Sequence, residues 1–505
     1  MNRRDFVAGA LLAAQLPLSG ATDAQVNPVG STPFDAQTVR QAAQKLAKLP
    51  YRAPDTKLPD AIANLSYDQY RAVRFDSGQA LWRGRNLPAE VQFFHRGFLF
   101  RSRVDISEVA DGLATPLRYR PEQFEFGPTP RPSVAELGYA GFRIHGALNR
   151  PDYLDEYAVF LGASYFRAAG RRQGYGLSAR GLSLKTADPG GEEFPAFTAF
   201  WLERPQPGTT AIGVWALLDS PSATAAMRFT IRPGDSTVFD VEFSLYPRVD
   251  LGQAGIATLT SMFYFDASDR RGIDDYRRAV HDSDGLLMLT GRGEELWRPL
   301  KNPTTLQVSS FTDTSPRGFG LMQRKRRLDD FQDLEARYDR RPSAWVEPIG
   351  DWGEGVVQLV EIPTKNDTHD NIVAFWRPKQ PLRANGEYNL TYRLHWGLEL
   401  PVRSDLARIS NTRGGLSFQA DTRLFVIDAA GEKLKSLPAD AKLTLAVSAD
   451  RGRVLNAVAQ SNLENGGWRM SFEVAPEDAK VVELRAQLML GDTPVSETWI
   501  YRWTT

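Results

Sequence analysis

The amino-acid sequence predicts a mainly β protein, in which a large β-sandwich domain precedes a smaller one. From about residue 90 onward, apolar and polar residues alternate in short runs bounded by Gly, Pro, Asp or Ser, the pattern of strands joined by turns. The composition, with 41 Gly, 32 Pro, 11 Trp, 16 Tyr and 27 Phe, suits many short strands around aromatic cores. No fixed period repeats, which argues against a solenoid or a propeller. A chain of 505 residues also exceeds one ordinary core, so at least two domains are expected.

The N-terminus predicts an export signal. Arg3 and Arg4 precede Phe6, a short apolar run and a region of small residues near Ala21 to Ala24. This order is typical of a twin-arginine signal peptide, which we place at residues 1–24; a chance arginine pair ahead of a general secretory signal is the alternative. No segment reaches the roughly 18 apolar residues of a membrane span, so we expect no stable membrane insertion.

The mature chain divides into two expected domains. Residues 38–49 ("TVRQAAQKLAKL") have apolar residues at helical spacing and predict a short amphipathic helix. The first domain spans residues 28–380 and contains runs such as "YAVFLGASYFRA" and "STVFDVEFSLYPRV". The polar, turn-rich residues 381–387 predict a linker. Residues 388–505 contain roughly seven further strands, which fits an immunoglobulin-like sandwich.

Composition excludes several function classes. The 61 basic and 61 acidic residues cancel, whereas a protein built to hold nucleic acid or an anionic membrane has a basic excess. The basic run Arg324–Arg327 is followed at once by Leu-Asp-Asp and predicts a solvated, self-compensated face. The absence of cysteine excludes thiol nucleophiles, thiolate zinc sites and iron–sulfur clusters. A neutral ligand such as a sugar suits this balance.

Metal and serine chemistry find little support. None of the five histidines forms a His-x-x-x-His pair, so we expect no catalytic zinc. The Asp-x-Asp of "HDSDG" would suit Mg²⁺ with a nucleotide sugar only inside an α/β nucleotide-binding domain, which the pattern does not predict. We therefore expect no cofactor and no metal. The nearest approach to a Gly-x-Ser-x-Gly elbow, around Ser164, falls inside an expected strand.

Paired carboxylates are the remaining candidates. Asp282 in "HDSDG" and Asp370 before the run "NIVAFWRP" both sit at expected strand mouths, where sheet scaffolds display catalytic groups. Glycoside hydrolysis needs one carboxylic acid to protonate the leaving oxygen and one carboxylate to activate the attacking group. Trp345, Trp352 and Trp376 lie near Asp370 in the sequence and offer flat faces for sugar rings. Two ordinary Asx turns are the alternative interpretation.

Ten stretches, in order, resemble the bacterial periplasmic glucan biosynthesis proteins of the MdoG/MdoD type. They are "FLGASYFRA", "YGLSARGL", "EEFPAFTAFWLERP", "HDSDGL", "GFGLMQR", "RRPSAWVEP", "GDWGEG", "EIPT", "DNIVAFWRP" and "SETWIYRW". The twin-arginine start favours the D-type member of this family. The resemblance implies a periplasmic protein with a large galactose-mutarotase-like sandwich and an immunoglobulin-like domain. It also implies that two copies can pair as a homodimer.

The resemblance further implies an anomer-inverting enzyme that acts on β-1,2-glucan during osmoregulated periplasmic glucan synthesis. Asp370 corresponds to the general acid, Asp282 to the general base and Tyr338 to a tyrosine on the proton path. Arg341 and Trp345 are expected along the sugar cleft. Trp352 and Asp284 are expected to contact substrate, with Asp284 also shaping its turn. We expect aromatic surroundings to raise the pKa of Asp370 so that it stays protonated near neutral pH.

Three functions remain open at this point. The first is an endo-β-1,2-glucanase or a glucan-cyclising transglycosylase, which differ in whether water or a sugar hydroxyl is the acceptor. The second is a non-catalytic protein that binds glucan and passes it on, because fold alone does not imply activity. The third, a sugar epimerase or mutarotase, is the weakest, since it would use a histidine and carboxylate pair and histidine is scarce.

Overall fold

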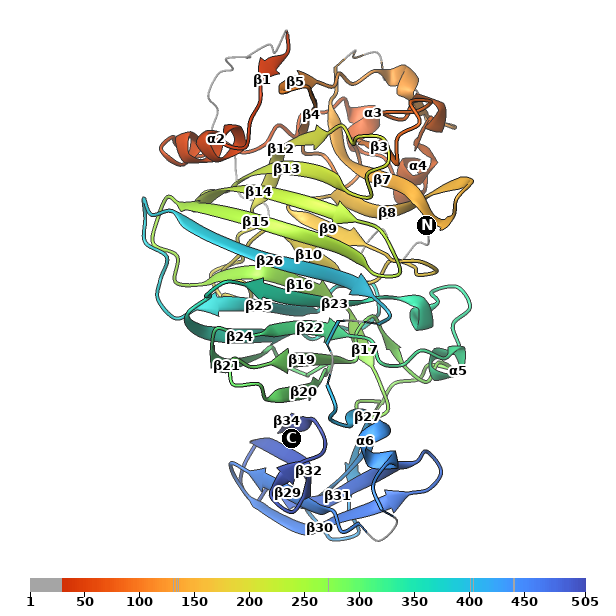
Figure 1. Ribbon diagram of the computed structural model, residues 1–505, viewed down its shortest axis with the longest axis vertical. Coiled ribbons are helices and arrows are strands. Elements are labelled where there is room, and N and C mark those ends of the chain that lie inside the picture. Colours follow the sequence, from red (N-terminus) through yellow and green to blue (C-terminus); the bar gives the residue numbers. More distant parts are fainter. Residues whose placement is uncertain are drawn as a thin grey trace.

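The computed structural model describes residues 30–505 except residues 130, 133, 135, 271, 400, 403, 439 and 440. The described chain is mainly β and forms a large sandwich followed by a small one, which confirms the predicted fold class (Figure 1). The expected signal peptide, residues 1–24, lies outside the described residues. No described helix is long and apolar enough to span a membrane.

One sheet runs through both sandwiches. Among the described residues it has 16 strands, which are, in spatial order, β1 (Thr32–Pro33), β5 (Leu113–Pro116), β4 (Asp105–Ala110), β12 (Ala196–Glu203), β13 (Ile212–Asp219), β14 (Ala223–Arg232), β15 (Thr237–Pro247), β26 (Tyr388–Gly397), β23 (Ser343–Ile349), β22 (Gly318–Met322), β19 (Gly285–Leu289), β20 (Glu295–Pro299), β34 (Thr498–Thr504), β32 (Val481–Leu490) and β29 (Thr444–Ala449), with β33 (Thr493–Pro494) beside β32. Strands β20 and β34 pair in parallel and join the two sandwiches.

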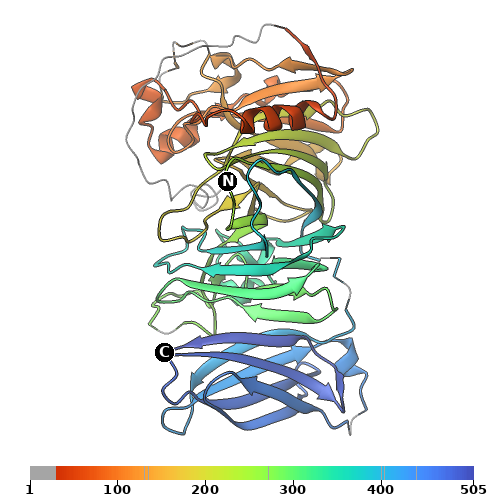
Figure 2. The same ribbon diagram turned by 90° about the vertical axis from the view of Figure 1, so that its left-hand side faces the viewer.

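The second sheet of the large sandwich packs against the first. Within the described chain its ten strands are, in spatial order, β21 (Gln307–Thr314), β24 (Glu354–Glu361), β25 (Ile372–Pro378), β16 (Ala254–Ser261), β10 (Ser178–Arg180), β9 (Tyr165–Ala168), β8 (Tyr153–Leu161), β7 (Tyr139–Arg150) and β3 (Ala89–His95), with β11 (Ser183–Leu184) beside β16. Figure 2 shows the molecule turned by 90°, with the small sandwich, in blue, at the end of the large one.

Aromatic rings fill the space between these two sheets. Phe160 stacks on Phe166 with ring centroids 5.4 Å apart, Phe166 lies 5.8 Å from Phe239, and Phe239 lies 5.0 Å from Trp396. Along β15, Phe239, Val241, Phe243 and Leu245 are buried, whereas Asp240 and Glu242 face outward. This period of two puts one face of the strand in the core, as the sequence pattern predicts.

The small sandwich has a four-stranded sheet facing β34, β32 and β29. Its strands are β27 (Arg408–Leu416), β28 (Arg423–Ala430), β31 (Gly467–Ala475) and β30 (Arg453–Asn462). Phe425 and Phe472 from this sheet pack against Trp499 of β34. Four strands facing three resembles the layout of an immunoglobulin-like domain.

The expected boundary between the domains is wrong. Strand β26, placed at the start of the second domain by the sequence, pairs with β15 on one side and β23 on the other. Its Leu394 and Trp396 are fully buried in the core of the large sandwich. Residues 381–387 are therefore a loop within the large domain, and the chain crosses to the small sandwich only after β26.

Short elements decorate the sandwiches. The helices are α2 (Thr38–Ala47), α3 (Asp60–Ala63), α4 (Tyr67–Ala72), α5 (Leu328–Phe331) and α6 (Glu432–Lys435), and the 3-10 turns are η1 (Ser77–Gln79), η2 (Pro121–Gln123) and η3 (Tyr338–Arg340). Two small ribbons pair β17 (Phe263–Phe265) with β18 (Val280–His281) and β2 (Arg74–Phe75) with β6 (Phe124–Glu125). Helix α2 confirms the predicted N-terminal helix and buries Val39 and Ala43 against β14 and its neighbours.

Candidate active site

Three chain segments meet at one end of the ten-stranded sheet. They are the β16–β17 link, the β18–β19 link and the residues before β25. The backbone N–H of Asp282 donates to the carbonyl of Met262 at 2.8 Å, and Ser261 pairs in register with Ile372. The structure therefore places Asp282 and Asp370 on neighbouring segments, although they are far apart in the sequence.

The side chain of Asn371 ties these segments together. It is buried, and its Oδ1 accepts from the N–H of Phe263 at 2.8 Å. Its Nδ2 donates to the carbonyls of Phe263 at 2.9 Å and Ile362 at 3.0 Å. Because Met262 binds Asp282 and Phe263 binds Asn371, this amide fixes the position of one carboxylate relative to the other.

Asp370 is a shielded carboxyl group without a hydrogen-bond partner. Neither of its carboxylate oxygens is solvent-exposed or bonded to any described residue. Burial raises the pKa of Asp370 to about 7, with a further rise from the negative charge of Asp282, while Arg167 offsets part of the effect of burial. The raised pKa was expected from the sequence, and loss of hydration is its main cause.

Asp282 is held as a paired carboxylate. It is 2% exposed, and its Oδ1 accepts a 2.6 Å charge-assisted hydrogen bond from Nη1 of Arg341. The guanidinium of Arg341 lies 4.5 Å from the centre of the Tyr338 ring and also donates to the carbonyl of Ala336. The contact with Arg341 fixes the orientation of the Asp282 carboxylate. Asp282 and Arg341, which the sequence predicted separately as a base and a cleft residue, thus lie in contact.

Tyr338 belongs to a buried polar network that reaches toward Asp370. It is fully buried, and its hydroxyl donates to Oδ2 of Asp367 at 3.0 Å. Arg277 donates to the same oxygen at 2.9 Å and to Asp333 at 3.2 Å. Asp367 and Asp370 lie on the same short loop, so these hydrogen bonds fix the loop that carries Asp370. Sequence reasoning missed Asp367 and Arg277, since isolated charged residues in loops carry no distinctive pattern.

Two arginines on adjacent strands complete the surroundings of Asp370. Arg167 of β9 and Arg180 of β10 both lower its pKa by their positive charge. Arg180 pairs with Glu192 at 2.5 Å and lies 4.9 Å from the centre of the Tyr165 ring. Arg167 stands in "FLGASYFRA" and Arg180 in "YGLSARGL", two of the stretches that carried the family resemblance. Their position beside Asp370 became visible only in the fold.

The face of the ten-stranded sheet that points away from the core carries polar groups without hydrogen-bond partners among the described residues. The register aligns Ser178 of β10 with Thr260 of β16. Both residues are fully buried, and neither hydroxyl has a partner within the part of the chain that the structure describes. Buried hydroxyls are normally hydrogen-bonded, so this face has capacity to bind water or the hydroxyls of a ligand.

Trp345 lies in a hydrophobic cluster near the domain junction. It is 3% exposed and packs in the core cluster of the small sandwich together with Leu287, Trp297 and Met322. A Cβ on Gly318 would lie 2.1 Å from its ring, so glycine is required beside it. The ring of Trp345 therefore packs toward the domain junction, and its expected contact with the sugar chain stays a prediction.

Trp352 is also a core residue. Its ring lies 6.3 Å from Trp376 and 6.0 Å from Tyr392, and its Nε1 donates to the carbonyl of Thr391 at 3.3 Å. Trp376 stands six residues after Asp370 on β25, which is about 20 Å along an extended strand. The side chain of Trp352 therefore lies far from the two carboxylates along the chain, and its contact with substrate stays a prediction.

Asp284 lines a pocket whose lining does not include Asp282. Its Oδ2 accepts from the backbone N–H groups of Arg324 at 3.0 Å and Lys325 at 3.3 Å, so it shapes the chain as expected. His281 is fully buried against Phe263, and burial lowers its pKa to about 3, so it is neutral at physiological pH. Neither residue contributes a proton donor or acceptor beside Asp370.

Comparison with known proteins shows which family this chain resembles. Residues 34–503 match the family model described as "Periplasmic glucan biosynthesis protein, MdoG". The chain is 57% identical over 505 residues to Glucans biosynthesis protein G of Rhodopseudomonas palustris (strain BisA53), and both chains are covered completely. It is 54% identical over 507 residues to the protein of that name in Bradyrhizobium diazoefficiens, again with full coverage of both.

A more distant relative gives the same result. Glucans biosynthesis protein G of Vibrio cholerae (strain ATCC 39541) is 50% identical over 478 residues, which cover 93% of this chain and 87% of that protein. These relatives carry the G name, so the D-type assignment drawn from Arg3 and Arg4 stays a prediction. Taken with the two-sandwich fold, the match over nearly the whole chain shows that this protein belongs to the MdoG family of periplasmic glucan biosynthesis proteins.

Proposed function

We propose that this chain is an anomer-inverting glycoside hydrolase or transglycosylase that acts on β-1,2-glucan during periplasmic glucan biosynthesis. The observation that carries the proposal is the contrast between two neighbouring carboxyl groups. Asp370 is shielded and unpaired with a pKa of about 7, whereas Asp282 is ion-paired to Arg341. Environments that separate two carboxyl groups in this way provide one acid and one base.

The chemistry assigns one role to each group. Asp370, protonated, donates its proton to the glycosidic oxygen as the bond from that oxygen to the anomeric carbon breaks. Asp282, ionised, accepts the proton of the attacking water or sugar hydroxyl, whose oxygen forms the new bond on the opposite face of the anomeric carbon. The acceptor decides between hydrolysis and transfer, and both outcomes invert the configuration.

The proposed proton path uses Tyr338. Its hydroxyl donates to Asp367, beside the loop that carries Asp370, and its ring supports the guanidinium that holds Asp282. This position between the two carboxyl groups supports a part in aligning both and in moving a proton between bound oxygens. Arg341 is proposed as the group that orients the base.

A non-catalytic glucan-binding protein is the second candidate. Unsatisfied hydroxyls of Ser178 and Thr260 on the outer sheet face would serve a binder as well as an enzyme. A binder, however, gains nothing from an unpaired carboxyl group with a pKa near neutrality. We also propose a periplasmic location reached through the twin-arginine signal of residues 1–24, and the homodimer implied by the family resemblance.

The test is an incubation of purified mature protein with linear β-1,2-glucan, followed by mass spectrometry and anomeric NMR of the products. Shorter chains with an inverted reducing end identify a hydrolase. Products without a reducing end and lighter by one water identify a cyclising transglycosylase. Unchanged glucan that nevertheless binds the protein would leave the binding candidate in place.

A further inference from the structure

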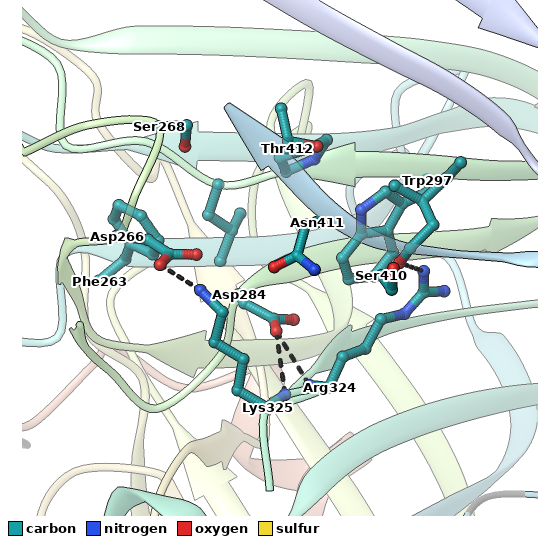
Figure 3. Close-up of a pocket in the computed structure, with 13 residues that line it drawn as sticks. Phe263, Asp266, Ser268, Asp284, Trp297, Arg324, Lys325, Ser410, Asn411 and Thr412 are labelled. Carbon is teal, nitrogen blue, oxygen red and sulfur yellow. Dashed lines mark hydrogen bonds and ion pairs between the residues drawn. The ribbon is translucent and has the colours of Figure 1, made fainter. Parts of the chain in front are cut away.

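A small pocket lies where the two sandwiches meet, apart from the proposed catalytic pair (Figure 3). The large domain contributes residues that follow β17, precede β19 and follow β22, together with Trp297 of β20. The small domain contributes four consecutive residues of β27, including Asn411 and Thr412. Figure 3 shows the side chain of Asn411 across the pocket from Asp284 and from the ion pair between Lys325 and Asp266.

One carboxylate oxygen in the pocket has no hydrogen-bond partner among the described residues. Asp284 is 9% exposed, and its Oδ2 is occupied by two backbone N–H groups. Its Oδ1 is shielded from solvent and bonded to no described residue. Burial raises the pKa of Asp284 to about 6, so the group is mostly ionised at pH 7 and its free oxygen requires a hydrogen-bond donor.

The nearby cations are already engaged elsewhere. The ammonium of Lys325 pairs with Asp266. The guanidinium of Arg324 binds both carboxylate oxygens of Glu497, at 2.8 and 2.6 Å, and lies 3.4 Å from the centre of the Trp297 ring. These bonds direct neither side chain at Oδ1 of Asp284, and no described residue donates to that oxygen, so a bound group can supply the donor.

The chemistry of the lining selects a neutral hydroxylated ligand. The carboxylates of Asp266 and Asp284 in the lining repel an anionic ligand. A divalent cation finds too few ligands, because Lys325 already neutralises Asp266 and the described residues contain no group of three or more metal-type ligands. Hydroxyl and amide groups of Ser268, Ser410 and Asn411 complete the lining and suit sugar hydroxyls.

The size of the pocket limits what enters it. Its cavity volume of about 20 Å³ has room for roughly one ordered water or one group of similar size. A hydroxyl or hydroxymethyl group on the edge of a sugar chain fits this space, with the ring itself outside. An ordered water would satisfy the same oxygen in the free protein and would be displaced by such a group.

We propose that this junction pocket is a second glucan-contact site, in which a sugar hydroxyl donates to Asp284 Oδ1 and bonds Asn411 on the opposite wall. The site grips a β-1,2-glucan chain from both domains at once, one short link away from Asp282. The inference rests on the proposed glucan ligand and does not depend on catalysis by Asp282 and Asp370.

The test uses the full mature chain carrying Asp370→Asn, mixed with linear β-1,2-glucan, and measures hydrogen–deuterium exchange and the Kd. Glucan should slow exchange in residues 408–416 and 262–269 as well as near residue 370. Asn411→Leu should abolish the slowing in residues 408–416 and raise the Kd about three- to tenfold, the effect of losing one or two hydrogen bonds. Asn411→Asp, which keeps the shape but replaces the amide donor, should raise it too.

The matched control is Gln460→Leu, which removes an exposed amide from β30 of the same sheet and should leave both readouts unchanged. Slowed exchange near residue 370 without any in residues 408–416, or a wild-type Kd in both folded Asn411 variants, would overturn the second site and leave the proposed function standing. No slowing anywhere would overturn both.

Discussion

Replacing Arg167 with methionine should move the alkaline limb of the pH–rate profile to higher pH. Burial raises the pKa of Asp370 to about 7, and the positive charge of Arg167 is the largest influence in the opposite direction. Methionine has a similar side-chain length but no charge. Burial and repulsion from Asp282 would then raise the pKa of Asp370 with less opposition from nearby positive charge. The pKa of Asp370 then rises further, and the general acid stays protonated at higher pH.

The size of the effect follows from the fraction of Asp370 that is protonated. With a pKa of about 7, roughly half of the wild-type enzyme has a protonated Asp370 at pH 7 and about one-tenth at pH 8. The kcat/KM of the wild type should therefore fall about fivefold between these values. In the Arg167→Met variant the fall over the same interval should be clearly smaller, whatever its absolute rate.

The assay is the initial rate of glucan conversion from pH 5 to pH 9 at constant ionic strength, normalised to each variant's maximum. Arg292→Met is the control, because Arg292 is an exposed arginine in the β19–β20 turn and is not among the main charges acting on Asp370. An alkaline limb that stays in place or moves to lower pH would refute Asp370 as the acid whose pKa Arg167 controls.

Three further outcomes are expected. Asp370→Asn should abolish turnover. It should also raise the free energy of unfolding by about 2–4 kcal/mol at pH 8 but not at pH 4. The pKa of Asp370 is higher in the folded than in the unfolded protein, so ionisation of Asp370 destabilises the native state as pH rises from about 4 through 7. Urea unfolding at the two pH values measures this, and equal gains at both would contradict it. Asn371→Ala should lower kcat roughly 100-fold with KM less affected, since the hydrogen bonds of the Asn371 amide align Asp282 with Asp370. An unchanged kcat in the folded variant would show that Asn371 has no such role. Trp345→Ala should cost about 3–5 kcal/mol of stability and leave the glucan Kd near the wild-type value, and a large loss of affinity in the folded variant would return Trp345 to the binding surface.

Local pattern predicted the strands well. The alternation of Phe239, Val241, Phe243 and Leu245 with polar residues marks β15 in any context, because one face of the strand is buried. Sheet membership depends on contacts between distant segments, which explains the misplaced boundary at residues 381–387. Strand β26 has the same alternating pattern whether it pairs with β15 or with strands of the small sandwich.

The site was predicted in part for a similar reason. Asp282 and Asp370 stand out as acids flanking strands, and Arg341 came with its matched stretch. The direction in which Trp345 and Trp352 point depends on packing, and a cluster of tryptophans in sequence does not reveal it. The network of Asp367 with Arg277 arises only when two loops fold against each other.

The central claim, that Asp282 and Asp370 catalyse inverting attack on β-1,2-glucan, is tested most directly by the anomeric NMR of fresh products. Wild-type protein should convert linear β-1,2-glucan into shorter chains whose new reducing ends first appear as the α-anomer, or into products without a reducing end. Asp370→Asn and Asp282→Asn should each give neither. Glucan left intact by the wild type, or converted equally fast by both variants, would contradict the account.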